Sequence, residues 1–311
     1  MAPVESTKMT SKKGKVAEVD IRLEPIWDAR AAGYVSADYH NHLNGDGTSR
    51  ANHQQTLRII EAEDLDHVAP MTWNRWERRI DREILGLQSE ESGYIVDQGQ
   101  EVRSHFHGHI GLNGVDVPYE PWFFGPSNPT LGDPDLTNGD VIAYAKTVGA
   151  FPTYVHPVAG ETDPFLDMST PTFPLEFPTD AILEDGVGLE IVTAWGNPTA
   201  AAHLWYRLLN IGKNVPTISG SDAWVDFYRT PAVGTARNYV RVEDGDSSYD
   251  AILAAAFAGR GFVSTGPALI FKLGDESRPG GVTSKGQQSW SLMLASTVDI
   301  DTVEIILNGQ V

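Results

Sequence analysis

From about Gly33 to Gly266 the sequence alternates short extended runs with helix-like runs. The extended runs are rich in β-branched and aromatic residues, and the helix-like runs have polar starts and glycine stops. Strands that alternate with helices are typical of βαβ units with parallel strands, so we predict an α/β fold with a barrel or a related sheet. The expected strands are 33–40, 65–73, 93–104, 109–115, 150–157, 188–195, 214–224, 238–242 and 262–267, and the expected helices are 49–64, 75–86, 138–149, 179–186, 199–212 and 247–261.

After about Gly266 the helix-like runs stop. The runs 268–274, 287–297 and 301–310 have the character of antiparallel strands in a small β module. The last run contains Leu-Asn-Gly, a hairpin signal that no return strand follows, so we expect this module to be incomplete. We therefore divide the chain into an N-terminal tail and lead-in segment (1–32), a barrel (33–272) and the start of a C-terminal β module (273–311).

Composition limits the partners and the type of metal site. The formal net charge of −19 opposes binding to nucleic acid, because such binding depends on Lys and Arg at the phosphates, and it favours a small or neutral substrate. No run is long enough to span a bilayer and no secretory leader is visible, so we expect a soluble protein without a membrane partner, in an undecided compartment. A homo-oligomer is compatible with the sequence. Because the chain has no cysteine, His, Asp and Glu must hold any metal.

The stretch SADYHNHLNGDG, residues 36–47, places two of the nine histidines of the chain two positions apart. Residues i and i+2 of a strand point to the same side, so His40 and His42 converge, with Asp38 on that side. Two neutral imidazoles directed at one point suit a divalent metal, whereas a polar strand end bonded only to backbone is the alternative. We expect Asp38 to orient a histidine ligand rather than to bind metal itself.

Further polar residues close or follow other extended runs. In α/β barrels the carboxyl ends of the strands build the active site, so these residues are expected to meet there. His105 and His107 share a run with His109, and spacing does not decide which of the three points inward. The candidate metal ligands are His40, His42, Glu101, His109, His156 and Asp222.

In this order, the motifs DYHNH, GQEV followed by GHIGLNG, YVHP and GSDA resemble the PHP (polymerase and histidinol phosphatase) metallohydrolase superfamily, and most closely its carbaryl-hydrolase-like CehA/McbA branch. The resemblance covers about Gly33 to Phe271. It implies a distorted (β/α)7 PHP-type barrel with a small C-terminal all-β module and a metal cluster at the strand ends. It also assigns the six candidate residues to the ligand positions of the family.

Two departures from the superfamily pattern concern the number of metal ions. The chain has Trp73 and Asn74 where the superfamily often has Asp-His, and Trp224 where it often has a final histidine. A third ion would lose most of its ligands, so we expect one or two divalent ions. Ligands of the N and O type admit zinc, manganese, iron or cobalt. Trp73, Trp224 and Tyr228 are then expected to line the substrate pocket.

The resemblance implies a metal-dependent hydrolase that cleaves an ester or carbamate with an aryl leaving group. Two ions bridged by Glu101 would hold a hydroxide for the attack, His105 or His107 would protonate the leaving group, and Arg229 or Tyr228 would steady the substrate. We expect the proline-rich loop 119–136 to be a lid, although its aromatic residues are more often core than pocket. The alternatives are a phosphoesterase of the same superfamily and a non-catalytic metal- or carbohydrate-binding module.

Overall fold

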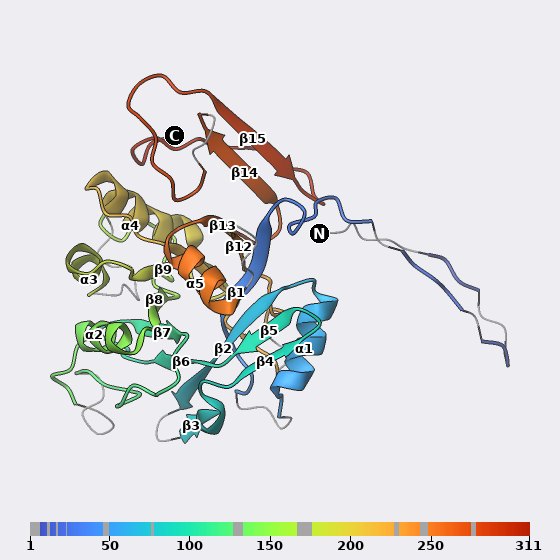
Figure 1. Ribbon diagram of the computed structural model, residues 1–311, viewed down its shortest axis with the longest axis horizontal. Coiled ribbons are helices and arrows are strands. Elements are labelled where there is room, and N and C mark those ends of the chain that lie inside the picture. The colour runs from blue at the N-terminus through green and yellow to red at the C-terminus, as the bar shows by residue number, and fades with distance from the viewer. Residues whose placement is uncertain are drawn as a thin grey trace.

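The structure is a computed structural model that describes residues 7–10, 13–16, 18–22, 24–45, 50–75, 78–126, 133–166, 176–226, 230–242, 248–274 and 278–311. Figure 1 shows one large curved sheet with helices on its outer side and a small separate sheet. The strands are β1 (Tyr34–His42), β2 (His67–Arg75), β3 (Arg78–Ile80), β4 (Gln88–Glu91), β5 (Tyr94–Asp97), β6 (Gly99–Val102), β7 (His109–Asn113), β8 (Phe151–Val155), β9 (Gly188–Thr193), β10 (Thr217–Gly220), β11 (Ala223–Trp224), β12 (Arg237–Arg241), β13 (Gly261–Ser264), β14 (Ala268–Leu273) and β15 (Trp290–Ala295). The helices are α1 (His53–Ala62), α2 (Asn138–Val148), α3 (Phe177–Leu183), α4 (Pro198–Asn210) and α5 (Tyr249–Phe257).

The large sheet forms a nearly closed wall. Its strands follow the order β10, β9, β8, β7, β6, β2, β1, β12, β13. The short strand β11 comes directly after β10 and pairs in parallel with β1, with Asn41 beside Ala223 and His42 beside Trp224. The wall from β1 to β10 therefore almost closes on itself, and this arrangement confirms the predicted α/β barrel class.

Most strands of the wall are parallel, but β7 runs antiparallel to both of its neighbours, β6 and β8. The segment from Val102 to His109 is too short for a parallel crossover, so the chain must reverse there. Because of this reversal, the first residue of β7 lies at the rim where the parallel strands β1, β2, β6, β8, β9 and β10 end. His109 accordingly lies beside Val155, the last residue of β8.

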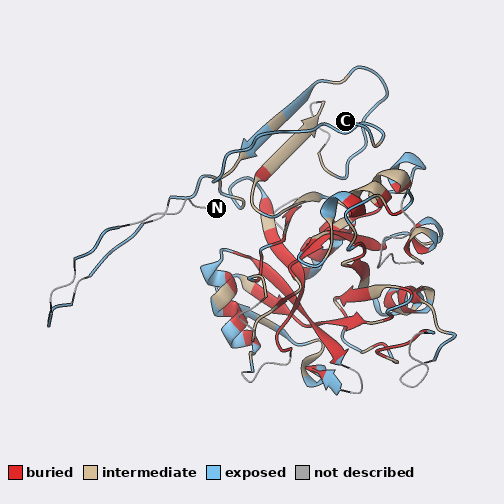
Figure 2. Ribbon diagram, turned by 180° about the vertical axis from the view of Figure 1, so that it is seen from behind, coloured by how far each residue is buried: buried red, intermediate tan, exposed pale blue. Residues whose placement is uncertain are grey.

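The core lies between the sheet and the helices, as the buried strands in Figure 2 indicate. Ile110 and Tyr154 from the sheet pack with Val141 of α2 and Leu204 of α4, and all four side chains are buried. The helices begin where local chemistry favours them. In α1, the side chain of Asn52 accepts from the Gln55 amide at 3.0 Å, and the Gln55 side chain accepts from the Asn52 amide at 3.1 Å.

Two predicted elements are wrong. The expected charged helix 75–86 is instead the strand β3 and a single 3-10 turn over Arg82–Ile84 in its described part. Asp81 stands between them with φ 59°, in the left-handed region, which breaks a helix, while Arg78–Ile80 pairs with β2. The expected strand 301–310 contains only an isolated bridge between Leu307 and Gln310.

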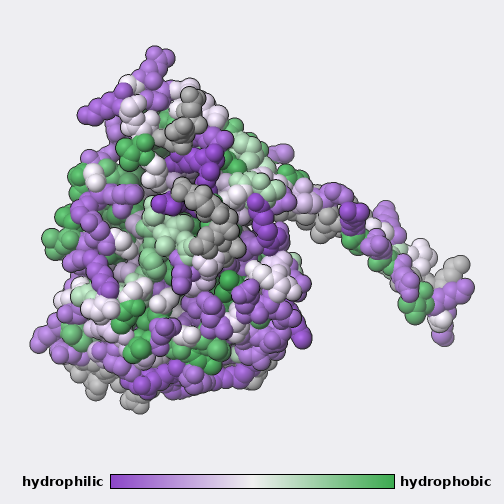
Figure 3. Space-filling model, viewed as in Figure 1, coloured by the Kyte–Doolittle hydropathy of each residue, from purple (hydrophilic) through white to green (hydrophobic). Residues whose placement is uncertain are grey.

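The chain ends also differ from the barrel. The described residues between 7 and 22 are exposed and extend away from the body in Figure 1. At the other end, β14 and β15 form a separate antiparallel hairpin, which starts before the predicted boundary at 272. Figure 3 shows hydrophilic residues mixed with small hydrophobic patches over one face. Among the described helices, none has the length and apolar character needed to cross a membrane.

The expected lid is only partly described, since residues 127–132 lie outside the described ranges. Tyr119, Trp122, Phe123 and Phe124 are all buried, and Tyr119 and Phe124 belong to the main core. These aromatic residues therefore anchor the described part of the loop to the barrel. This part of the loop is packed against the core and is not an exposed flap.

Candidate metal centre

The end of β1 supplies two imidazoles whose orientation is fixed by their Nδ1 atoms. His42 donates from Nδ1 to the Met71 carbonyl at 2.9 Å, and His40 donates from Nδ1 to Glu190 Oε1 at 3.1 Å. When the rings are neutral, both Nε2 atoms then present a lone pair to the same space. Nε2 of His40 is buried and has no hydrogen-bond partner within the described part of the chain. Such an orphaned acceptor indicates a missing electrophile, such as a metal ion.

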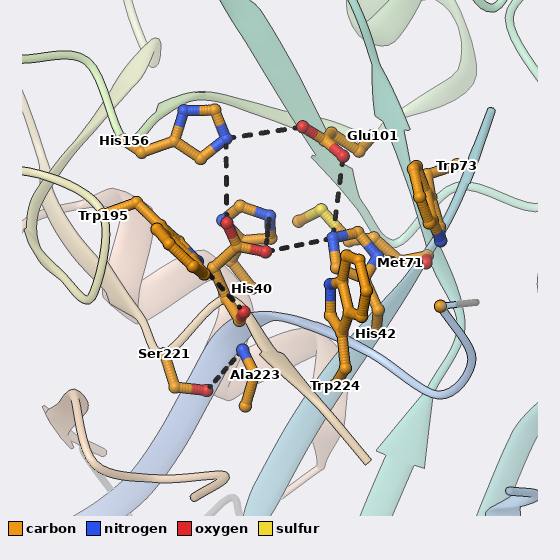
Figure 4. Close-up of polar contacts among 12 residues, drawn as sticks. His40, His42, Met71, Trp73, Glu101, His156, Trp195, Ser221, Ala223 and Trp224 are labelled. Carbon is orange, nitrogen blue, oxygen red and sulfur yellow. Dashed lines mark hydrogen bonds and ion pairs between the residues drawn. The ribbon is translucent and has the colours of Figure 1, made fainter. Parts of the chain in front are cut away.

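Three residues from other strand ends lie close to these imidazoles, and Figure 4 shows two of them, Glu101 and His156. Glu101 lies on β6, His156 follows β8, and Asp222 follows β10. Asp222 Oδ1 is 3.5 Å from His40 Nε2 and 3.1 Å from His42 Nε2. Glu101 Oε2 is 3.6 Å from His42 Nε2, and Glu101 Oε1 is 3.4 Å from His156 Nε2. The predicted convergence at the strand ends thus occurs for all five residues.

The spacing of these atoms fits a divalent ion. With metal–ligand bonds of about 2.0–2.2 Å, neighbouring ligand atoms lie ~3–4 Å apart. The distances above fall in this range, and the atoms form two overlapping groups, His40–His42–Asp222 and His40–Glu101–His156. These buried groups could hold metal ions, and N and O ligands leave the identity of the metal open.

Charge at the centre also favours a cation. Burial raises the pKa of Glu101, but hydrogen bonding from His109 and His156 outweighs this and lowers it well below its usual range. Burial lowers the pKa of His40, yet Asp222 and Glu190 outweigh it and raise the pKa to about 10. Buried carboxylates therefore stay ionised and draw positive charge to the site, either a proton on His40 or a metal ion.

The three histidines of the run 105–109 have different environments. His109 Nδ1 lies 2.7 Å from Glu101 Oε1, and His109 Nε2 lies 2.9 Å from His105 Nδ1. Both ring nitrogens of His109 are thus engaged, and its assignment as a metal ligand stays a prediction. His107 instead pairs with Glu176 at 3.1 Å, outside the two metal groups. Burial lowers the pKa of His109 to about 3, so its imidazole is neutral.

Two further acidic residues hold the ligands in place. Glu190 binds His40 and also accepts from the His156 amide at 2.5 Å. Asp38 accepts from the amides of His40, Ser221 and Gly234, so it fixes the backbone beside two ligands, as expected for a supporting residue. Sequence reasoning missed Glu190, although a single carboxylate inside the apolar run GLEIV was a usable signal.

The ligand-bearing loops are also strained. His156 has φ 33° and Asp222 has φ 47°, in the left-handed region that residues other than glycine rarely adopt. Strain of this kind is typical of functional sites, where the surrounding structure enforces it. Gly220, next to these loops, lies so close to His40 that an added Cβ would come within 2.3 Å of the His40 Cβ.

A cavity of about 320 Å³ adjoins the centre. Trp73 and Trp224 stack at 5.6 Å, and the Trp73 ring lies 5.4 Å from the His42 ring. The cavity is lined by Trp73, Asn74, Arg75, Arg103, His105, Phe123 and Trp224. Two of the predicted pocket residues, Trp73 and Trp224, are therefore part of the lining, whereas Tyr228 and Arg229 lie outside the described residues.

Comparison with known protein families gives no match, and neither does a search of curated proteins. Solved structures to which the chain is similar include PsfC from Pseudomonas syringae PB-5123, at 14% identity and a TM-score of 0.45 over 72% of this chain and 87% of PsfC. An Endonuclease Q in complex with a 27-mer duplex bearing an abasic lesion is similar at 16% identity and a TM-score of 0.43, over 75% of this chain and 58% of the endonuclease. The lesion-specific endonuclease PfuEndoQ from Pyrococcus furiosus is 14% identical, with a TM-score of 0.46 over 74% and 57% of the two chains. The matches span less than two thirds of both endonucleases.

Proposed function

We propose that this chain is a divalent-metal-dependent hydrolase of the PHP type, related to the CehA/McbA branch, that cleaves esters or carbamates of aryl alcohols. The observation that carries this proposal is the convergence of His40, His42, Glu101, His156 and Asp222 beside an aromatic cavity. A bound divalent ion supplies Lewis acidity and activates water for attack on a carbonyl. The partner is a small organic molecule, in keeping with the cavity volume of about 320 Å³.

The protein contributes orientation of the ligands. The Met71 carbonyl and Glu190 hold His42 and His40 in the tautomer that presents Nε2. This second layer of hydrogen bonds also keeps the imidazoles from turning away when a substrate enters. Glu101 Oε2 faces His42 and Glu101 Oε1 faces His156, so both oxygens of Glu101 would be available to hold a metal ion.

A chain of two imidazoles connects Glu101 to the cavity. Hydrogen bonds link Glu101 to His109 and His109 to His105, and His105 lines the cavity. An imidazole can accept a proton at one ring nitrogen while it gives one up at the other, so His109 and His105 offer a route by which a proton from a water activated at the centre could reach the leaving-group oxygen. Burial and Arg103 both lower the pKa of His105, which makes protonated His105 a better acid. His107 is turned toward Glu176 and takes no part in this scheme.

A phosphoesterase is the second candidate, and one observation favours it. Arg75 and Arg103 line the cavity, and Arg103 Nε lies 3.9 Å from Glu101 Oε1. Guanidinium groups near a metal centre suit a phosphoryl oxygen as well as a substituent on an aryl ring. A comparison of reacting groups on the same leaving group separates the two candidates.

The test uses 4-nitrophenyl acetate, 4-nitrophenyl N,N-dimethylcarbamate and 4-nitrophenyl phosphate with protein reconstituted with zinc, manganese, iron or cobalt. We expect metal-dependent turnover with kcat/KM at least about tenfold higher for an acyl substrate than for the phosphate, since every 1.4 kcal/mol of barrier is tenfold. His156→Ala, loaded in the same way, is the control for hydrolysis by surface groups. The reverse preference would establish the phosphoesterase instead. Bound metal without turnover of any substrate would favour a binding module.

A further inference from the structure

The cavity beside the metal centre combines aromatic walls with two arginines in a chain whose overall charge is −19. We propose that this cavity selects substrates whose aryl group carries an anionic substituent, such as a carboxylate or sulfonate, and that Arg103 binds this substituent. The inference rests on the proposed function, because it names the class of leaving group that the hydrolase accepts. It adds an anionic requirement to the aryl group expected from the sequence.

Arg103 is held in a fixed position with donors to spare. Its Nη1 donates to the Asn74 carbonyl at 2.8 Å, and its guanidinium lies 5.3 Å from the centroid of the Trp73 ring. Neither Nε nor Nη2 of Arg103 donates a hydrogen bond to any described residue, and Nε is buried. Because Nε is buried and lies 3.9 Å from Glu101 Oε1, a ligand in the cavity would meet the remaining N–H groups of Nη1 and Nη2. These groups of a fixed guanidinium can bind the two oxygens of a carboxylate or sulfonate.

The walls of the cavity fit an aromatic ring next to this guanidinium. Trp73 and Trp224 stack on each other with an interplanar angle of 30°, and Phe123 lies edge-on to the His105 ring at 4.9 Å. A volume of about 320 Å³ is at the small end of ligand pockets, so the cavity suits a small aromatic group. A second cation, Arg75, lines the same cavity.

The alternative role of Arg103 is structural, since its bond to Asn74 ties the end of β2 to β6. A second alternative is that Arg103 only balances the charge of Glu101, 3.9 Å away. Both alternatives predict that substitution of Arg103 affects neutral and anionic ligands equally. A loss of affinity for anionic ligands alone would show that Arg103 recognises the anionic substituent and would exclude both alternatives.

The first experiment measures binding, which does not depend on turnover. Metal-loaded protein is titrated with benzenesulfonate, benzamide and acetate, with tryptophan fluorescence as the readout. We expect benzenesulfonate to bind at least about tenfold more tightly than benzamide, as a charge-assisted fork does. Acetate, which has a metal-binding carboxylate but no ring, is expected to bind weakly. Equal affinity for benzenesulfonate and benzamide would overturn the proposal.

Variants identify the residue responsible. Arg103→Met is expected to abolish the preference for benzenesulfonate, and Arg103→Lys to reduce it severalfold because an ammonium lacks the planar fork. Arg58→Met, an exposed position on α1 outside the cavity, removes the same charge and is expected to keep the preference. An unchanged preference in Arg103→Met would show that the anion binds elsewhere, and equal losses for both ligands would show a structural role. Should Arg103→Met fail to fold, Arg103→Lys decides by the same ratio.

The second experiment measures turnover of 3-acetoxybenzoate and 3-acetoxybenzamide, which share the reacting ester. We expect kcat/KM to favour the benzoate in the wild type and the ratio to fall at least about tenfold in Arg103→Met. Turnover of neither ester, together with selective binding of benzenesulfonate, would refute the proposed function and leave the anion subsite standing. Turnover of both esters with a ratio that Arg103→Met leaves unchanged would refute the subsite alone.

Discussion

At the scale of single residues, the metal centre depends on side chains whose orientation is fixed by hydrogen bonds or by the backbone conformation. The Nδ1 atoms of His40 and His42 are engaged by Glu190 and the Met71 carbonyl, so only Nε2 is available to a ligand. His156 and Asp222 are held in left-handed backbone conformations. Contacts with neighbouring residues stabilise this arrangement. Substitutions in the centre therefore allow the effect on metal affinity to be measured separately from the effect on the stability of the fold.

We expect His156→Ala to lower the affinity for the divalent ion by at least about tenfold, because a ligand contributes no less than a residue that only orients one. The fold should persist, since the His156 side chain is 21% exposed and alanine meets the same backbone strain. Competition with a chelator measures the affinity. His203→Ala on α4 is the control. Wild-type affinity in His156→Ala would remove His156 from the ligand set.

A second prediction concerns Gly220, where an added Cβ would come within 2.4 Å of Glu190 Oε1 and within 2.3 Å of the His40 Cβ. We expect Gly220→Ala to lower the free energy of unfolding by about 1–3 kcal/mol, the usual effect of overpacking, and to weaken metal binding. Urea denaturation and chelator competition measure the two effects. Gly266→Ala, where no atom lies within 4 Å, should match the wild type. Equal behaviour of both variants would contradict the close approach.

The predictability of the site varies from residue to residue. His40 and His42 were predictable because alternation in a strand directs both to one side. Glu190 was not assigned: the single carboxylate in the apolar run GLEIV marks it as unusual, but its contact with His40 appears only when β1 and β10 lie against β9. The environment of His109 also depends on contacts from distant segments. Spacing alone does not specify which of several nearby histidines turns inward.

At the scale of elements, helices with local capping residues could be predicted from the sequence. The direction and pairing of the strands depend instead on contacts between distant segments. The run 49–64 was predicted as a helix, and α1 begins within it at His53, where Asn52 and Gln55 satisfy each other's amides. The reversal of β7 was not predicted, since it depends on which strands flank it. The charged run 75–86 is rich in the helix formers Arg, Glu and Leu, yet pairing of β3 with β2 prevailed over propensity.

We expect Asn52→Ala to lower the free energy of unfolding by about 1 kcal/mol, since it leaves an amide of the first turn without its acceptor. Asn52→Asp keeps an oxygen in the same place and should retain most of the stability. Urea denaturation of the metal-free protein measures both, and hydrogen exchange at the start of α1 locates the loss. A loss as large in Asn52→Asp as in Asn52→Ala would contradict the cap.

At the scale of the whole molecule, metal and proton compete for the negative centre. Near neutral pH the metal-free protein carries a proton on His40, whose pKa is raised to about 10 by Asp222 and Glu190 despite burial. The unfolded chain releases this proton at about pH 6.5. A raised pKa stabilises the folded state fully below that pH, and the stabilisation is lost as pH rises toward 10.

The unfolding free energy of metal-free protein should therefore fall between pH 7 and pH 9, by up to about 2.7 kcal/mol at 1.36 kcal/mol per pH unit. Metal-saturated protein should lack this dependence, because His40 then needs no proton. The stabilisation by metal should accordingly grow with pH. Urea denaturation at pH 7, 8 and 9, with chelator or with saturating metal, measures it. If the unfolding free energy changed with pH in the same way for metal-free and metal-saturated protein, the competition between a proton and the metal ion at His40 would be contradicted.

Asp38 joins segments that are far apart along the chain, since it accepts from the amides of Ser221 and Gly234, 183 and 196 residues away. Closing a loop of this length costs roughly 4–5 kcal/mol of chain entropy beyond a constant term. The centre can therefore form only when β11 has reached β1, late in folding. An ion added to the unfolded chain meets scattered ligands and does not act as a nucleus. An ion held by these residues would instead bind after the barrel wall has closed, and it would slow the reopening of that wall.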